Sequence, residues 1–336
     1  MKKKVMIFVF LLVAATALFA GRYGGDFMMI GAGVRSLGMG GAFVALADDS
    51  SAIYWNSGGI SQIRESEASA MHAFLYGNLA SYDHLSYIQP LPNEVSIGFN
   101  VTRLTVSDIP FFDEKYLIGT NVDQRISDSD YHLPGVPDGK FRSTDDLYQF
   151  SFSKNINLNA DMGWQFFAIP MEIGLGANVK FIQRKIKDNS GSGTGLDFGV
   201  KIKTDMAVLF DEDDFGNLHI GFNFQDIAGT TVRWDTVSEN RDKILFNTKF
   251  GLAAQQPIPS LNSEIIVAWD KDYVHGGTHH FGVDWSYNEM ANLRLGYYDD
   301  NFSCGASLNI YGAWLDYALI TNPVGITNRL GLRFRF

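Results

Sequence analysis

Hydrophobic and polar residues alternate along most of this chain, from about Ser66 to the C-terminus. In residues 95–102, for example, Val, Ile, Phe and Val alternate with Ser, Gly, Asn and Thr. A period of two places one set of side chains on each face of a β-strand. Polar breaks separate the alternating runs, and this pattern therefore predicts a chain built almost entirely of strands.

The alternating runs predict about fourteen strands. Residues 161–169 are assigned to a connection, although they could form another strand. An even number of antiparallel strands is typical of a closed outer-membrane barrel, in which every backbone hydrogen bond is satisfied without a free edge. The predicted fold is all-β, a transmembrane antiparallel β-barrel of about 14 strands. The predicted strands are 66–76, 80–89, 94–104, 145–153, 171–184, 194–204, 217–226, 244–255, 262–270, 278–287, 291–298, 302–311, 313–321 and 328–336.

Alternation alone also fits a soluble sandwich, so other features decide between the two. Aromatic residues near the predicted strand ends favour a membrane, because their rings prefer its interface. The last strand places Phe334 and Phe336 on one face and ends the chain on Phe336. Such an ending resembles the signal by which the barrel-assembly machinery recognises outer-membrane proteins. The aromatic residues are Tyr297, Tyr298, Tyr311, Trp314 and Tyr317.

The N-terminus has the pattern of a secretory signal peptide, residues 1–20. Three lysines precede an apolar run from Val5 to Phe19, and small residues offer cleavage after Ala17 or Ala20. The run is shorter than the roughly 20 residues that a membrane-spanning helix needs. We therefore expect export to the cell outer membrane, with outer-membrane lipids around a barrel formed by residues 66–336.

Composition excludes several functions. The 27 basic and 37 acidic residues give a net charge of −10, which disfavours nucleic-acid binding. The single Cys excludes an internal disulfide or an all-Cys zinc site. No Gly-x-Ser-x-Gly motif of a hydrolase is found, and we expect no enzymatic activity and no cofactor.

One group of histidines and carboxylates suggests a metal site, but its spacing argues against one. His279 and His280 are adjacent, so on a strand they face opposite sides and cannot both bind one ion. We therefore expect no metal. The group comprises Asp270, Asp272, His275, His279 and His280.

The connections suggest an orientation. With the N-terminus in the periplasm, the short turns 90–93, 288–290 and 311–312 are periplasmic, and the long segment 105–144 is extracellular. Segments 154–170 and 205–216 are long for periplasmic turns, and we expect short helices in them.

Residues 21–65 do not alternate and contain two notable runs. The first is the glycine-rich sequence from Arg35 to Ala45, and the second leads from Asp48 through Tyr-Trp-Asn to Gly59. Asp48 or Asp49 would cap a short helix through Trp55, and Gly58 could supply its left-handed end.

This segment resembles the N-terminus of FadL-type outer-membrane proteins, particularly the shorter PorV/PorQ-like branch. The family pattern reads Arg-Ser-Leu-Gly-Met-Gly-Gly-Ala-Phe-Val-Ala, then Ala-Asp-Asp, then Tyr-Trp-Asn-Pro-Ala-Gly-Leu. The match covers about 25 residues, and Ser57, Gly58 and Ile60 depart from it. The departure loosens the turn, because proline fixes φ and glycine frees it.

The resemblance implies that residues 21–65 form a hatch inside the barrel. It also implies passive transport of small hydrophobic molecules such as long-chain fatty acids, which leave sideways through the wall. Whether the hatch gates the pore or only plugs it stays open. The alternative is a PorV-like accessory protein, with secretion-system proteins as partners and a sealed barrel. The implied hatch residues are Arg35, Gly38, Gly40, Gly41, Asp48, Asp49, Trp55, Asn56, Ser57, Gly58 and Gly59.

Several basic residues are predicted to face the lumen. They could bind an anionic head group, or they could pair with hatch carboxylates such as Asp48 and Asp49 or with other lumenal acids. We favour pairing. These residues are Lys180, Arg184, Lys201, Lys203, Arg294, Arg329, Arg333 and Arg335.

Overall fold

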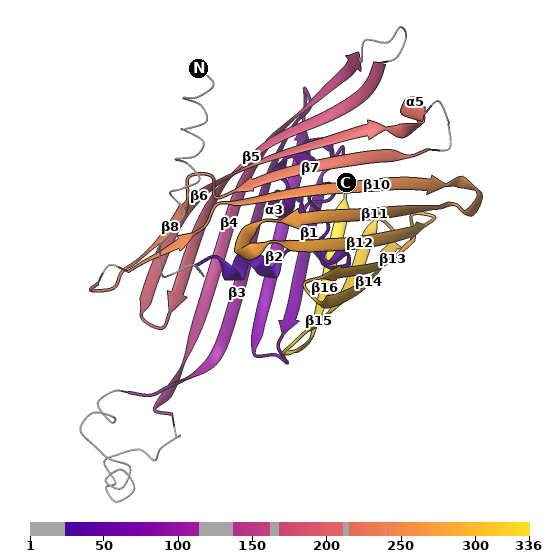
Figure 1. The fold of residues 1–336 in the computed structure, drawn as a ribbon. Helices are drawn as coiled ribbons and strands as arrows, with labels where there is room; N and C mark the ends of the chain where they lie inside the picture. The colour runs from indigo at the N-terminus through magenta and orange to yellow at the C-terminus, as the bar shows by residue number, and fades with distance from the viewer. Residues whose placement is uncertain (1–23, 114–136, 162–167, 211–214, 239) are drawn as a thin grey trace, which may run out of the picture.

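A computed structural model describes residues 24–113, 137–161, 168–210, 215–238 and 240–336 (Figure 1). The predicted signal peptide and residues 114–136 of the long connection lie outside the described residues. None of the described helices is long and apolar enough to cross a membrane.

The sheet contains sixteen strands, of which all but β8 and β9 form one closed antiparallel ring. Fourteen strands thus form the barrel, and β1 closes it by pairing with β16. The predicted fold is confirmed. The barrel strands are β1 (Glu67–Leu75), β2 (Ala80–Leu91), β3 (Val95–Phe111), β4 (Gly139–Asp161), β5 (Ala168–Ile186), β6 (Asn189–Asp205), β7 (Asn217–Gln225), β10 (Asn247–Ile258), β11 (Ser263–Asp272), β12 (Thr278–Tyr287), β13 (Ala291–Tyr298), β14 (Asn301–Ile310), β15 (Ala313–Asn322) and β16 (Gly325–Arg335).

The structure corrects three details of the prediction. Strands β3 and β4 extend seven and six residues further toward the long connection than predicted, to Phe111 and from Gly139. Residues 154–161 continue β4 and residues 168–170 begin β5 where a helix was expected, because Ile156 and Leu158 still alternate with Asn. Residues 162–167 of this segment lie outside the described residues. A short hairpin, β8 (Thr230–Trp234) and β9 (Arg241–Ile244), was not predicted, since strands this short carry little alternation. The predicted helix in 205–216 is present as α5 (Met206–Phe210).

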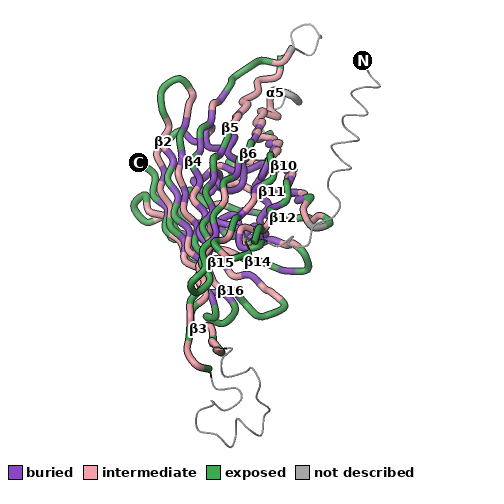
Figure 2. Tube along the Cα trace, turned by 90° about the vertical axis from the view of Figure 1, so that its left-hand side faces the viewer, coloured by how far each residue is buried: buried purple, intermediate pink, exposed green. Residues whose placement is uncertain are grey.

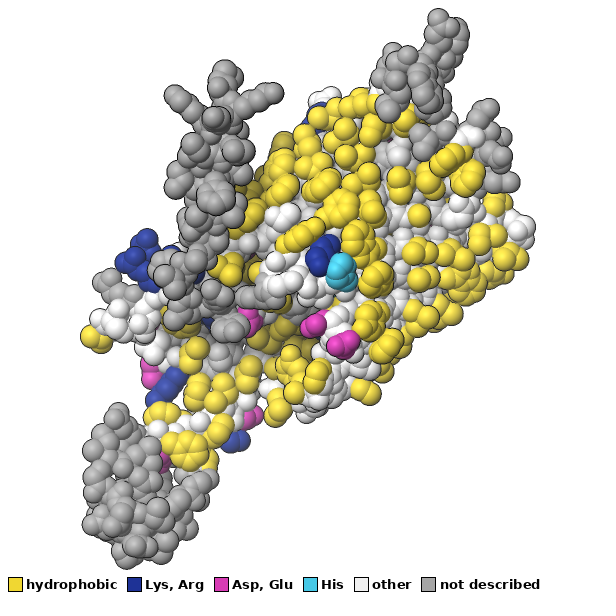
Figure 3. Space-filling model, viewed as in Figure 1, with side chains coloured by type: hydrophobic (Ala, Val, Ile, Leu, Met, Phe, Trp, Pro, Cys, Tyr) yellow, Lys and Arg dark blue, Asp and Glu magenta, His cyan; other side chains and the backbone are white. Residues whose placement is uncertain are grey.

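Side chains alternate between the two faces of the wall along most of each strand. Exposed and buried residues follow one another along the strands, as Figure 2 shows. Apolar side chains cover the visible outer face (Figure 3), whereas buried polar and charged residues line the lumen. This arrangement is the reverse of a soluble protein and suits an outer face in contact with lipid acyl chains.

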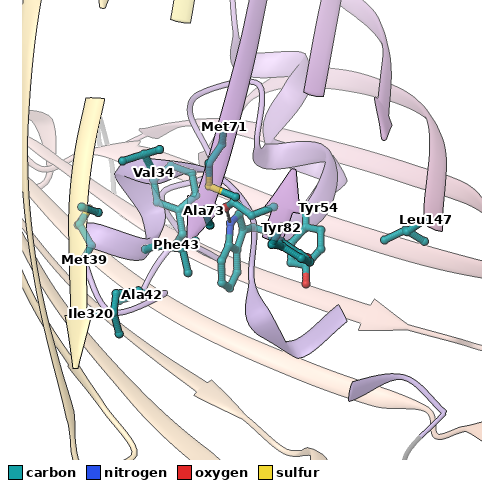
Figure 4. Close-up of a cluster of buried hydrophobic side chains, with 14 of the residues drawn as sticks. Val34, Met39, Ala42, Phe43, Tyr54, Met71, Ala73, Tyr82, Leu147 and Ile320 are labelled. Atoms are coloured by element: carbon teal, nitrogen blue, oxygen red, sulfur yellow. Dashed lines mark hydrogen bonds between the residues drawn. The ribbon is translucent and has the colours of Figure 1, made fainter. Parts of the chain in front are cut away.

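Short helical elements fill the lumen. They are η1 (Asp26–Ile30), α2 (Val34–Gly38), α3 (Ala52–Trp55) and η2 (Ser57–Gln62), and two further turns, η4 (Pro259–Leu261) and η5 (Val274–Gly276), lie between barrel strands. The hydrophobic core therefore lies inside the barrel, where hatch residues such as Val34 and Phe43 pack against wall residues such as Met71 and Tyr82 (Figure 4). We call residues 31–62 the docked hatch.

Ten glycines on the inner face of the wall explain how the docked hatch fits. A Cβ atom added to any of them would lie within 3.3 Å of a hatch atom. Glycine lacks this atom and therefore allows the hatch backbone to lie directly against the strands. We call these residues the glycine belt: Gly98, Gly174, Gly176, Gly199, Gly221, Gly251, Gly282, Gly296, Gly305 and Gly331.

Candidate functional site: the hatch and the cavity beside it

A buried ionic network fastens the hatch to the wall. The Arg35 guanidinium on α2 contacts Asp48, and its Nε lies 3.0 Å from Asp284 Oδ2 on β12. Asp284 also lies 3.2 Å from Arg294 Nε, and Asp49 lies 3.9 Å from Arg35. Arg35 thus connects two parts of the hatch with the barrel, and the carboxylates around it compensate the positive charge of its guanidinium.

Asp48 is held ionised by this network. Burial would raise the pKa of Asp48, but Arg35 and then Lys201 attract its negative charge and hold the pKa well below its usual value. A carboxyl group whose pKa is lowered by folding contributes stability above its unfolded pKa of about 3.9 and loses it only as pH falls through the lower native value.

We therefore expect acidification from about pH 8 to about pH 5 to leave the contribution of Asp48 intact. Asp48→Asn should instead lower the thermal unfolding midpoint throughout that range, because Arg35 loses its nearest partner. Circular dichroism of the folded barrel against temperature measures both. A wild-type midpoint that falls to that of Asp48→Asn at the acidic end would contradict the assignment.

The start of α3 differs from the sequence prediction. The residue preceding the helix is Ser51, and Asp49 Oδ1 accepts hydrogen bonds from its backbone N (2.9 Å) and hydroxyl (2.6 Å). Neither Asp48 nor Asp49 is itself the N-cap. The carboxylates are used elsewhere, because Arg35 draws Asp48 away and Asp49 orders the turn before the helix.

The predicted role of Gly58 is also wrong. Gly58 lies within η2 and does not adopt a left-handed conformation. Asn56 caps η2 instead: its Oδ1 accepts from Gly58 N (3.1 Å), while its Nδ2 donates to Val44 O and Val200 O. A Cβ on Gly58 would lie 2.6 Å from Gly174 O on β5, so close contact with the wall explains this glycine.

The other motif residues contact either the wall or other parts of the hatch. Gly40 and Gly41 have φ angles of 67° and 77°, and Gly40 O lies 2.6 Å from His280 Nδ1. Trp55 Nε1 donates to Ala32 O (2.7 Å) within the hatch. Gly38 lies against Gly305 and Ser57 against Gly176 of the wall, whereas Gly59 lies against Ala47 within the hatch.

Asp270 is a hatch-binding residue that sequence reasoning placed in a possible metal group. Its Oδ2 accepts from the backbone N of Phe43 and of Val44, both at 2.6 Å. Its neighbour Asp272 pairs with Lys249 at 2.8 Å. His279 and His280 face opposite sides of the wall, and the side chain of His275 lies outside the described residues.

The chain end has the two faces that the sequence suggested. Phe334 and Phe336 are exposed on the outside, whereas Arg333 and Arg335 turn inward. Arg335 Nε lies 2.6 Å from Glu67 Oε2, which joins the last strand to the first. This arrangement leaves the terminal Phe residues available to lipid or to another protein.

Most of the lumenal cations that were considered as head-group ligands are paired with carboxylates of the wall. Lys180 lies 2.8 Å from both Asp197 and Asp226. Lys201 instead donates to the backbone carbonyl groups of Leu46 and Ala47. Arg329 differs from the rest: its Nη1 donates to Thr327 Oγ1 (3.1 Å), and it forms no ion pair among the described residues. The other pairs are Arg184–Asp145, Lys203–Glu172, Arg294–Asp284, Arg333–Asp316 and Arg335–Glu67.

A small cavity of about 60 Å³ lies beside the hatch, covered by η1. Its lining is mixed: the described polar groups include the paired ions Lys180–Asp226 and Lys249–Asp272. For comparison, a dry cavity that binds benzene in another protein measures about 150 Å³. An aromatic ring therefore needs the cavity to widen. The apolar lining consists of Met28, Met29, Leu147, Ile244, Leu245 and Val274.

The wall next to this cavity has an interruption in its strand pairing. Strand β6 pairs with β7 only through residues 198–205 and with β8 only at Gly191 and Ser192. Between them, two hydrogen bonds of 2.9 Å join the two sides, from Ile227 N to Leu196 O and from Asp226 N to Asp197 Oδ1. Thr231 and Thr230 also lie close to Gly193 and Gly195. We call residues 193–197 and the facing residues 226–230 the β6 seam. Asp226 belongs to both the seam and the cavity lining.

Solved structures share this architecture. The toluene transporter TbuX of Ralstonia pickettii has 11% sequence identity, 91% of this chain and 98% of that chain covered, and a TM-score of 0.52. The P. putida toluene transporter TodX has 9% identity, coverage of 91% and 99%, and a TM-score of 0.52. The monoaromatic hydrocarbon channel CymD has 10% identity, coverage of 91% and 98%, and a TM-score of 0.53.

No family model matches the sequence, and no curated protein matches it. The structural similarity therefore concerns the fold alone: this chain shares its barrel architecture with the solved channels. It does not extend to the PorV/PorQ-like branch. The predicted location in an outer membrane agrees with this barrel type and with the apolar outer face.

Proposed function

We propose that this barrel allows small, neutral hydrophobic molecules to cross the outer membrane passively. The observation that carries the proposal is the position of the cavity, which lies between the short element η1 and the β6 seam in the wall. The solved channels with the same fold are described as transporters of toluene or channels for monoaromatic hydrocarbons, which supports this ligand class.

The charges beside the cavity favour a neutral ligand over a fatty acid. A carboxylate buried away from water needs a cation that is free to pair with it. Lys180 and Lys249 line the cavity, but each already pairs with wall carboxylates at 2.8 Å. A fatty acid would have to displace these partners, whereas a small aromatic hydrocarbon needs only apolar contact.

The proposed gate is η1 and not the whole hatch. The docked hatch lies against the glycine belt, and moving it would separate many close backbone contacts. In contrast, η1 has one buried residue, Phe27, and its Met29 side chain is 54% exposed. Displacing η1 would open the cavity, and parting the two bonds of the β6 seam would give the ligand a sideways route to lipid. An accessory protein with a sealed wall would need neither feature.

Binding of 4-fluorotoluene to the purified protein in lipid nanodiscs tests the ligand class, with ¹⁹F NMR line width as the readout. We expect broadening by the wild type and its loss in Leu147→Trp, because the larger side chain fills the cavity. Leu158→Trp, on the outer face of the same strand, is the matched control and should behave as wild type.

Excess oleate completes the experiment. Because both described lysines that line the cavity are already paired, oleate should displace 4-fluorotoluene poorly. Equal broadening in Leu147→Trp and Leu158→Trp would show that the probe binds elsewhere or only partitions into lipid. If oleate displaces the probe at a far lower concentration than toluene does, the ligand class is a fatty acid and not a neutral hydrocarbon.

A further inference from the structure

A cluster of nitrogen donors lies on the outer face of the barrel, where the wall meets one rim. Lys271 on β11 and His279 on β12 are directly opposite each other in the strand register. Lys271 Nζ lies 2.8 Å from His279 Nε2, and Trp269 Nε1 lies 3.2 Å from His279 Nδ1. Tyr273 packs near the Lys271 ammonium, 5.9 Å from ring centre to Nζ.

This cluster contains more donors than acceptors. The lysine ammonium and the tryptophan N–H are donors only, and a neutral imidazole offers one acceptor nitrogen and one N–H. Whichever tautomer His279 adopts, one donor therefore faces another N–H, and protonation of the ring removes the last acceptor. Lys271 has no carboxylate partner among the described residues. The cluster thus lacks an anion that could accept from all three groups.

The surroundings indicate where that anion would come from. Trp269 of the cluster is opposite Phe281, and the next outward pair below it is Val267 opposite Val283; these side chains form part of the apolar outer face. Figure 3 shows this face with an adjoining basic and histidine side chain between hydrophobic ones. The rim is also the one that carries the long connection after Phe111, the side that faces outward in such barrels.

We propose that Lys271, His279 and Trp269 bind the phosphate group of a phosphorylated glycolipid in the outer leaflet. The phosphate accepts from Lys271 Nζ, from an N–H of the His279 ring and from the indole N–H of Trp269. Each of these donors forms a stronger hydrogen bond with a charged acceptor than with a neutral one. The acyl chains of the lipid lie along the apolar rows below. A free phosphate ion would gain none of these apolar contacts, and for this reason the site is assigned to a lipid.

The test uses the purified full-length barrel in phosphatidylcholine nanodiscs that contain bisphosphorylated lipid A, with retained lipid counted by native mass spectrometry. We expect the wild type to retain lipid A and Lys271→Gln/His279→Gln to bind it about tenfold more weakly. The matched control is Lys185→Gln/His72→Gln, which changes the same residue types on outward positions elsewhere and should stay near wild type.

Two further arms separate the possible ligands. Lipid A without its phosphates should be retained no better by the wild type than by Lys271→Gln/His279→Gln. Inorganic phosphate should compete only weakly. Equal retention of lipid A by that variant and the wild type would overturn the site, as would equal retention with and without phosphates. Efficient competition by inorganic phosphate would overturn the assignment to a lipid.

Discussion

A disulfide that fixes η1 to the wall is expected to stop hydrocarbon uptake, and a reductant should restore it. The change is Gly25→Cys with Ile244→Cys in a Cys304→Ser background. A Cβ on Gly25 lies 3.0 Å from Ile244 Cγ2, so the two cysteines are near enough to pair. Because η1 covers a cavity of about 60 Å³, locking it keeps the cavity too small for an aromatic ring.

Toluene uptake by cells that express the variant, before and after reduction, measures this effect. The single variants Gly25→Cys and Ile244→Cys control for the substitutions themselves and should transport in both conditions. If the oxidised double variant transports as well as the reduced one, η1 is not the gate, and movement would have to be sought in the docked hatch.

Adding a side chain to the glycine belt is expected to destabilise the barrel strongly. A Cβ on Gly282 would lie 2.6 Å from Met39 O and 2.8 Å from Met39 Cβ, and backbone cannot move aside as a flexible side chain can. Overpacking a tight interior costs about 1 to 3 kcal/mol. Because the added side chain meets backbone, we expect Gly282→Val to lower the free energy of unfolding by about 3 kcal/mol. Urea unfolding of the reconstituted barrel measures the change.

Gly139→Val is the matched control. Like Gly282, Gly139 lies in a strand and has no left-handed conformation, but an added Cβ there meets nothing within 4 Å. We expect its free energy of unfolding to stay within about 0.5 kcal/mol of wild type. Similar stability of Gly282→Val and Gly139→Val would mean that the docked hatch does not depend on the glycine belt.

Strand alternation was sufficient to predict the strands, and the N-terminal pattern, the aromatic strand ends and the terminal Phe336 then favoured a membrane barrel over a soluble sandwich. The alternating pattern is strong because lipid covers one face of the wall and the filled lumen covers the other. The polarity of a strand residue therefore indicates the face on which it lies. Prediction failed where that contrast weakens: the hairpin β8–β9 is short and lies beyond the ring, and the Asn residues at the end of β4 resemble a turn.

The candidate site was less predictable from sequence. The N-terminal motif drew attention to Arg35 and Asp48, but their partner Asp284 lies more than two hundred positions away. The same holds for Asp270, which binds hatch backbone from β11. Lumenal glycines such as Gly174 and Gly199 were visible as part of the alternation, yet only the folded hatch explains them. Long-range docking of backbone leaves no local pattern.

Uptake of radiolabelled toluene at low concentration tests the central claim most directly. It is measured in cells that lack their own hydrocarbon transporter, with and without the wild-type protein in the outer membrane and with folding verified. The account predicts faster, saturable uptake in cells that contain the barrel and no added passage for a hydrophilic solute of similar size. Identical toluene uptake with and without a correctly folded barrel would contradict it.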